Sequence, residues 1–158
     1  MTLTEELSLR NHILPLVEDI LSRSVTVNEK LFAICEVLED EVPTFNWVGF
    51  YLIDPEVKTE LVLGPFVGAP TDHTRIPFGK GICGQVALSH QTFVSQDVRA
   101  EENYLSCSIN VRSEIVVPIM KSDKFVAQLD IDSHTRNSIT TEQKEMLEEI
   151  CKLLAEEF

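Results

Sequence analysis

SEIVVPIMKSDKFVAQLDID, residues 113–132, consists of two apolar runs joined by a short polar turn. Runs rich in valine and isoleucine on either side of such a turn predict a β-hairpin. Asp130 and Asp132 are two residues apart, so their side chains point to one face of the second strand, where Glu114 of the first strand is expected to meet them. Three carboxylates in a partly apolar pocket cannot all ionise at low cost. We therefore expect one of them to have a raised pKa and to act as a proton donor.

The segment before this hairpin, residues 73–112, contains Cys83 and Cys107 in polar, glycine-rich surroundings. The run GKGICGQVALSHQ predicts a short helix that begins near Gly81 or Ile82. With Cys83 in the first turn, the unpaired N–H groups and the helix dipole favour a thiolate, and we expect its pKa to be lowered. Residues 99–112 are expected to form a polar loop that holds Cys107. Thiols in such loops beside carboxylates indicate redox chemistry.

The strand pattern over the whole chain predicts an α+β fold. Residues 46–54 and 60–66 are expected to pair as a hairpin, and residues 92–98 add a short strand. Alternation along the first strand puts Trp47 and Tyr51 on one face of the sheet. A meander of about six strands should form a mostly antiparallel sheet, with the N- and C-terminal helices on one face and ligand-pocket loops on the other.

Three terminal segments have helical periodicity. The first helix, over residues 4–22, is expected to be interrupted near Pro15. The second has Asn28 as its expected cap, and the last opens with the capping box of Thr140 and Gln143. Apolar residues at helical spacing place two cysteines in the core: Cys35 and Cys151.

Composition narrows the classes of function. A chain of 158 residues with 44% apolar and 25% charged residues fits one soluble domain, residues 1–158. The net charge of -13 and the lack of a basic cluster argue against nucleic acid as a partner. With no membrane-spanning run and no secretory signal in the sequence, we expect a cytoplasmic protein without a membrane partner, whose four cysteines do not form a disulfide framework.

Six motifs occur in register along the chain: NWVGFY, LGPF, RIPFGKGICG, QTxxxxDV, SEIVVPI and LDID. In order and spacing they resemble the free methionine-(R)-sulfoxide reductases, which are single GAF domains. The resemblance implies a GAF fold and the thiol-dependent reduction of free L-methionine-(R)-sulfoxide to methionine through a cysteine sulfenic acid. Because GAF domains carry many functions, the fold alone does not determine the activity.

The resemblance also implies a role for each matching residue. Cys107, in the loop before SEIVVP, corresponds to the catalytic nucleophile, and Cys83 of GICG to a second redox cysteine near the pocket. Trp47 and Tyr51 of NWVGFY are expected to enclose the methyl and sulfoxide end of the substrate. The acidic residues of SEI and LDID are expected to hold its polar groups and to support proton transfer: Glu114, Asp130 and Asp132.

One position departs from the family pattern. The family usually has a third, resolving cysteine two residues before Arg-Ile-Pro, and here that position is His73. A disulfide between Cys83 and Cys107, reduced by thioredoxin, is one expected route for regeneration, and direct reduction by a small external thiol is the other. His73 is expected to contact the substrate or to stabilise the thiolate.

Two other functions remain open because the resolving cysteine is missing. One is a ligand-binding GAF sensor or a divergent GAF enzyme, and the other is a general redox sensor. A zinc site built from Cys83, Cys107, His73 and His90 has no C-x-x-C or H-x-x-x-H pair to support it, so no metal and no cofactor are expected. Family members commonly form homodimers, and the apolar N-terminal helix offers an interface, although no residue pattern demands one.

Overall fold

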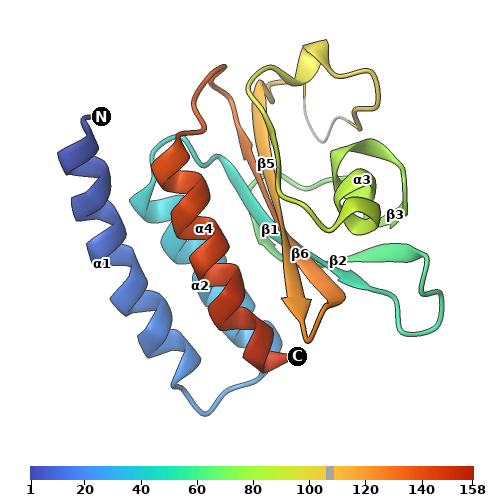
Figure 1. The fold of residues 1–158 in the computed structure, drawn as a ribbon, viewed down its shortest axis with the longest axis horizontal. Helices are drawn as coiled ribbons and strands as arrows, with labels where there is room; N and C mark the ends of the chain where they lie inside the picture. The colour runs from blue at the N-terminus through green and yellow to red at the C-terminus, as the bar shows by residue number, and fades with distance from the viewer. Residues whose placement is uncertain (106–108) are drawn as a thin grey trace.

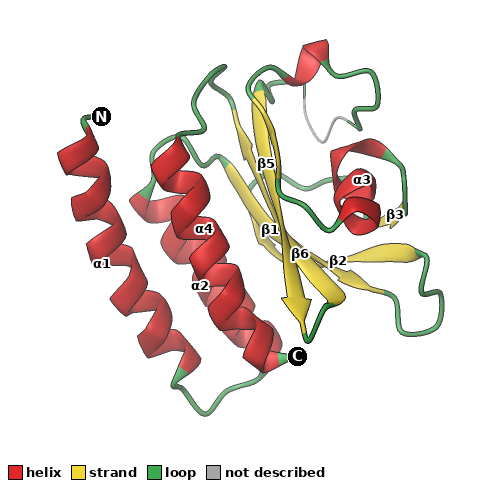
Figure 2. Ribbon diagram, viewed as in Figure 1, coloured by secondary structure: helices red, strands yellow, loops and turns green. Residues whose placement is uncertain are grey.

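The computed structural model describes residues 1–105 and 109–158 and has an α+β fold (Figures 1 and 2). Six strands form one sheet in the order β3-β2-β1-β6-β5-β4, and every strand pair in this described sheet is antiparallel. The predicted six-stranded antiparallel sheet is confirmed. Its strands are β1 (Trp47–Ile53), β2 (Glu60–Val67), β3 (Arg75–Pro77), β4 (Phe93–Ser95), β5 (Ser113–Lys121) and β6 (Lys124–Ser133).

The helices divide between the two faces of the sheet. Three long helices lie together on one face in Figure 1, as predicted for the terminal segments: α1 (Leu3–Leu21), α2 (Val27–Glu41) and α4 (Thr141–Leu154). The short helix α3 (Gly81–Ser89) lies on the other face with β3 and the long loops, and two 3-10 turns complete the fold, η1 (Val98–Ala100) and η2 (Ala155–Glu157). Among the described residues no helix has the length and apolar character needed to cross a membrane.

Strand β1 lies in the middle of the sheet, between β2 and β6, and contributes to two separate cores. Val48 and Phe50 pack in the larger core beneath the three helices. Trp47 and Tyr51 pack in the smaller core beneath α3. The predicted alternation of β1 side chains between the two faces is therefore confirmed, and it makes the α3 face the one that carries the candidate site.

The β5–β6 hairpin has a tight turn and, close to it, a register shift between Ile119 and Met120. Ser122 and Asp123 at the turn both have positive φ, 50° and 65°, which is the conformation of a two-residue type I′ turn. This turn matches the right-handed twist of the flanking strands. The shift changes the pairing by one residue, from Met120 opposite Phe125 to Ile119 opposite Ala127, and as a result Glu114 pairs with Asp132 at the far end of the hairpin.

The expected break at Pro15 is wrong, because α1 is continuous through it. Pro15 lies on the exposed face of the helix, so the backbone carbonyl that it leaves without an intrahelical donor can be solvated. The opposite face holds the helix in place through Ile13, Val17 and Ile20, which are buried.

The expected cap at Asn28 is also wrong, because Thr26 caps α2 and accepts a hydrogen bond from the N–H of Glu29. Both residues are good caps, and the sequence did not distinguish them. The capping box of α4 is confirmed, with Thr140 and Gln143 bonded to each other's backbone N–H groups.

Candidate active site

A small cavity lies on the α3 face of the sheet, and a carboxyl cluster forms one of its walls. The volume open to the centre of a water molecule is about 10 Å³, which is room for roughly one water. Its lining residues come from β1, β5, β6, the β2–β3 loop, β3, the start of α3 and the loop after η1: Tyr51, His73, Ile76, Lys80, Gly81, Ile82, Cys83, Leu105, Glu114 and Asp130.

Three predicted carboxyl groups converge beside this cavity. Glu114 of β5 pairs directly with Asp132 of β6, and Asp130 follows two residues earlier on the same face of β6. All three are buried, with 4%, 1% and 1% of the surface of Glu114, Asp130 and Asp132 exposed. Glu114 and Asp130 line the cavity, whereas Asp132 does not.

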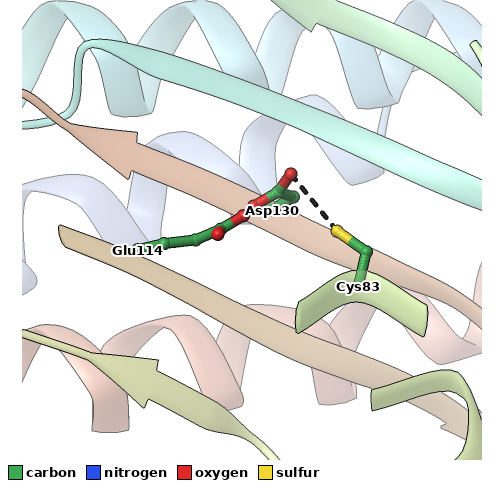
Figure 3. Close-up of side chains that lie close together, drawn as sticks. All are labelled: Cys83, Glu114 and Asp130. Carbon is green, nitrogen blue, oxygen red and sulfur yellow. Dashed lines mark hydrogen bonds between the residues drawn. The ribbon is translucent and has the colours of Figure 1, made fainter. Parts of the chain in front are cut away.

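Cys83 joins this cluster from the opposite side of the cavity. Its thiol donates a hydrogen bond to Asp130 Oδ2 at 3.4 Å, and Figure 3 shows Glu114 reaching the same carboxyl group from β5. Cys83 belongs to the first turn of α3, as predicted, and the side chain is buried. The structure thus brings one thiol and two carboxyl groups together from segments far apart in the sequence.

Burial and mutual repulsion control ionisation in this cluster. Burial raises the pKa of Glu114 well above its usual range, and the charges of Asp130 and Asp132 raise it further. Burial also raises the pKa of Asp130, although hydrogen bonds from Glu114 and Cys83 lower it in part. Glu114 therefore has the character of a proton donor.

The lowered pKa expected for Cys83 is wrong. Burial raises the pKa of the Cys83 thiol, and Asp130 and Glu114 raise it further because they disfavour a neighbouring negative charge. The helix terminus does not compensate, since the N–H of Gly81 is already bonded to Asn103 Oδ1. Cys83 is a protonated thiol held against a carboxyl group, rather than a thiolate stabilised by a helix.

Two aromatic residues of β1 form the wall next to the carboxyl cluster. Trp47 and Tyr51 stack with ring centroids 6.4 Å apart, and Trp47 Nε1 donates a hydrogen bond to the Ala69 carbonyl. The Trp47 ring lies over Gly49, where a Cβ atom would come within 2.4 Å of it. The missing side chain at Gly49 thus makes the space that Trp47 occupies. Tyr51 lines the cavity, and Trp47 lies behind it.

His73 reaches the cavity through the loop between β2 and β3. Its backbone carbonyl accepts a hydrogen bond of 2.8 Å from the Tyr51 hydroxyl. The structure therefore brings five of the predicted site residues to the cavity: Tyr51, His73, Cys83, Glu114 and Asp130. Cys107, the predicted nucleophile, lies outside the described residues.

Sequence reasoning missed three residues that shape the cavity. Lys80 is an exposed residue of the cavity lining, and Leu105 packs against Gly81. Asn103 joins the loop after η1 to the start of α3. Its Oδ1 accepts a hydrogen bond from the N–H of Gly81, and its Nδ2 donates one to the carbonyl of Gly79. The glycine-flanked Lys80 in FGKG was the available signal for one of them. The other two depend on a contact between distant segments.

The sequence pattern of one domain family matches most of the chain, from residue 28 to residue 158, and the description of that family is GAF domain. The chain belongs to the GAF domain family. One GAF relative, GAF domain-containing protein A of Dictyostelium discoideum, is 36% identical over 143 residues, which are 90% of this chain and 88% of that protein.

Other GAF relatives carry the name predicted from the motifs. The free methionine-R-sulfoxide reductase of Escherichia coli is 33% identical over 114 residues, 72% of this chain and 67% of that protein. The free methionine-R-sulfoxide reductase of Neisseria meningitidis, solved in complex with its substrate, matches with a TM-score of 0.89 and 36% identity, covering 96% of this chain and 89% of that one. The predicted resemblance is confirmed. That His73 replaces a family cysteine stays a prediction.

Proposed function

We propose that this GAF domain is an oxidoreductase that reduces free L-methionine-(R)-sulfoxide to methionine. The observation that carries the proposal is the buried cluster of Cys83, Glu114 and Asp130 at a small cavity. Reduction of a sulfoxide needs a thiolate, a proton donor and a second reductant, and this cluster supplies a proton donor beside a thiol. Named relatives with the same motifs support the choice of substrate.

In the first step, the thiolate of Cys107 attacks the sulfoxide sulfur. Glu114 donates its proton to the sulfoxide oxygen, because its raised pKa favours the protonated form. The oxygen passes to Cys107, which becomes a sulfenic acid, and the substrate leaves as the thioether methionine. The sulfur of the substrate is reduced and the sulfur of Cys107 is oxidised by the same two electrons.

In the second step, Cys83 attacks the sulfenic acid sulfur, a disulfide forms, and water leaves. Asp130 already accepts a hydrogen bond from the Cys83 thiol, so it can take the proton as the new S–S bond forms. Thioredoxin or a small dithiol then reduces the disulfide by exchange. When Cys83 does not react, an external thiol attacks the sulfenic acid directly.

The charges around the cavity suit a free amino acid. Lys80 offers a cation for the substrate carboxylate, and the carboxyl cluster offers negative charge for its ammonium group. A methionine sulfoxide inside a peptide lacks both groups. The cavity holds only about one water, so the substrate must displace lining side chains such as Leu105, which packs against Gly81.

Turnover with purified protein tests the proposal. The R epimer of free methionine sulfoxide should be converted to methionine when thioredoxin or dithiothreitol is present. The S epimer and N-acetylmethionine sulfoxide, measured in parallel, should react much more slowly. Cys107→Ser should abolish turnover, while Cys83→Ser should reduce turnover with thioredoxin more than with dithiothreitol. No turnover of the R epimer by the wild-type protein contradicts the proposal.

A ligand-binding GAF sensor is the second candidate function, and it is favoured by a histidine, His73, at the position expected for a resolving thiol. This candidate predicts saturable binding of methionine or its sulfoxide without turnover. Detection by intact mass of a Cys83–Cys107 disulfide after addition of the sulfoxide would count against it. A general redox sensor predicts instead that peroxide oxidises Cys107 with no preference for the sulfoxide.

Compartment and assembly belong to the same proposal. Cys35, Cys83 and Cys151 are free thiols in the described part of the chain, and a reducing compartment such as the cytoplasm suits them. A homodimer stays a prediction, and light scattering after size-exclusion chromatography measures it directly.

A further inference from the structure

Cys83, Glu114 and Asp130 are arranged like the ligands of one metal ion. One ligand atom from each lies within 4.8 Å of the other two, and all three side chains are buried. They come from α3, β5 and β6, so rigid elements fix their positions. This set differs from the zinc ligands weighed from the sequence, because it contains no histidine and only one cysteine.

The distances agree with the coordination geometry of zinc. A tetrahedral Zn²⁺ with a Zn–S bond of about 2.3 Å and a Zn–O bond of about 2.0–2.2 Å holds its sulfur and oxygen ligands about 3.5–3.7 Å apart. Cys83 Sγ and Asp130 Oδ2 are already 3.4 Å apart. The Glu114 oxygen lies within 4.8 Å of both atoms and has to move closer to complete a regular tetrahedron.

Two observations support a small cation in place of the proton that Glu114 shares with Asp130. Asp130 Oδ1 is buried and accepts no hydrogen bond from an N–H or hydroxyl group of the described residues. Such an acceptor next to a second carboxyl group is compensated only by a proton or a cation. In addition, all three side chains line the cavity of about 10 Å³, which admits one water-sized ligand. A water there can complete a four-coordinate site.

We propose that Cys83, Glu114 and Asp130 form a binding site for a thiophilic divalent cation of the size of Zn²⁺ or Cd²⁺. The ion binds the Cys83 sulfur as a thiolate and one oxygen of each carboxyl group, and the displaced protons pass to solvent. Thiolate and carboxylate together favour such ions over Mg²⁺ and Ca²⁺, which take oxygen ligands alone. Because the ion occupies the proton donor and the second thiol of the proposed reductase, it is a reversible inhibitor.

Titration of the reduced, metal-free protein with Cd²⁺ measures binding without reference to activity. One equivalent should produce a thiolate-to-metal charge-transfer band in the ultraviolet, and Zn²⁺ should remove it by competition, whereas Mg²⁺ should not. Cys107→Ser should keep the band. Cys83→Ser should lose the band. Asp130→Asn and Glu114→Gln should weaken metal binding by at least about tenfold, because loss of a residue that only hydrogen-bonds to a metal ligand already lowers metal affinity by about that factor.

Matched controls separate this site from other cysteines and from misfolding. Thermal unfolding of each variant shows whether the fold is kept, and Glu145→Gln removes an exposed carboxylate of α4 without touching the cluster. A band that persists in Cys83→Ser or disappears in Cys107→Ser overturns the proposal, as does the absence of binding to the wild-type protein. Only the expected inhibition rests on the proposed function. Metal binding without inhibition of turnover contradicts the reductase roles of these groups and leaves the metal site intact.

Discussion

Glu114 and Asp132 lie directly opposite each other in the β5–β6 pair, and both are buried. Like charges at directly opposed positions of a sheet destabilise it, so this pair is stable only while it holds a proton. The raised pKa of Glu114 means that the folded state binds this proton more tightly than the unfolded chain does.

The first prediction concerns the pH dependence of stability. The stabilisation from the Glu114 proton is fully present below the usual value of 4.5 and is lost as the pH rises through the raised pKa of the folded state. The free energy of unfolding should therefore fall as the pH rises from 4.5 to the raised pKa of the folded state, with a slope of up to ~1.4 kcal/mol per pH unit for one group. Glu114→Gln should flatten this slope and Glu145→Gln should not, as measured by urea unfolding across pH. Equal slopes in the wild type and Glu114→Gln would contradict the proton assignment.

The second prediction concerns Lys80 at the cavity. Lys80→Met should raise KM for free methionine sulfoxide by about 2- to 5-fold with little change in kcat, because an exposed ion pair contributes up to roughly 1 kcal/mol. Lys58→Met, in the exposed turn between β1 and β2, removes the same charge away from the site and should leave KM unchanged. An equal effect of both variants would show that only the overall charge matters.

The third prediction concerns a buried amide with no partner. Gln128 of β6 is fully buried, and neither its Nε2 nor its Oε1 has a hydrogen-bond partner among the described residues. Gln128→Met keeps the shape of the side chain and removes both polar atoms, so it should stabilise the protein by about 1–3 kcal/mol. Chemical unfolding measures the gain. A loss of stability would mean that the Gln128 amide forms hydrogen bonds in solution, for example to a buried water.

The fourth prediction concerns the room for Trp47. Gly49→Ala puts a methyl group within 2.4 Å of the Trp47 ring and should destabilise the fold by about 1–3 kcal/mol. Displacement of Trp47 should also weaken its hydrogen bond to the Ala69 carbonyl and raise KM. Gly64→Ala, whose nearest contacts would be 3.2 Å or longer, is the matched control and should cost less. If the order of the two costs is reversed, Gly49 is not needed for the space of Trp47.

Local patterns were sufficient to predict much of this fold. Alternation along β1 predicted which residues face α3, and the spacing of Asp130 and Asp132 predicted that they share a face. The T-x-x-Q pattern at Thr140 predicted the start of α4. Each of these features depends on residues that are close in sequence, so a periodicity or a cap motif is enough to reveal it.

The predictions that were wrong, and the residues that were missed, depend on contacts between segments distant in the sequence. Pro15 is tolerated because of what packs on the opposite face of α1, which its own neighbours do not reveal. The pKa of Cys83 follows from its burial and then from the carboxyl groups on β5 and β6, which its sequence neighbours do not reveal. Likewise, Asn103 reaches Gly79 and Gly81 only after the chain has folded.

The hydrogen bond from the Tyr51 hydroxyl ends on the main chain of residue 73, not on its side chain. A carbonyl group is present whichever amino acid stands there, so the anchor of this loop does not constrain the side chain. Mutation at this position can therefore exchange one chemistry for another while the frame of the cavity persists. A cysteine introduced at position 73 would inherit a support that is already built.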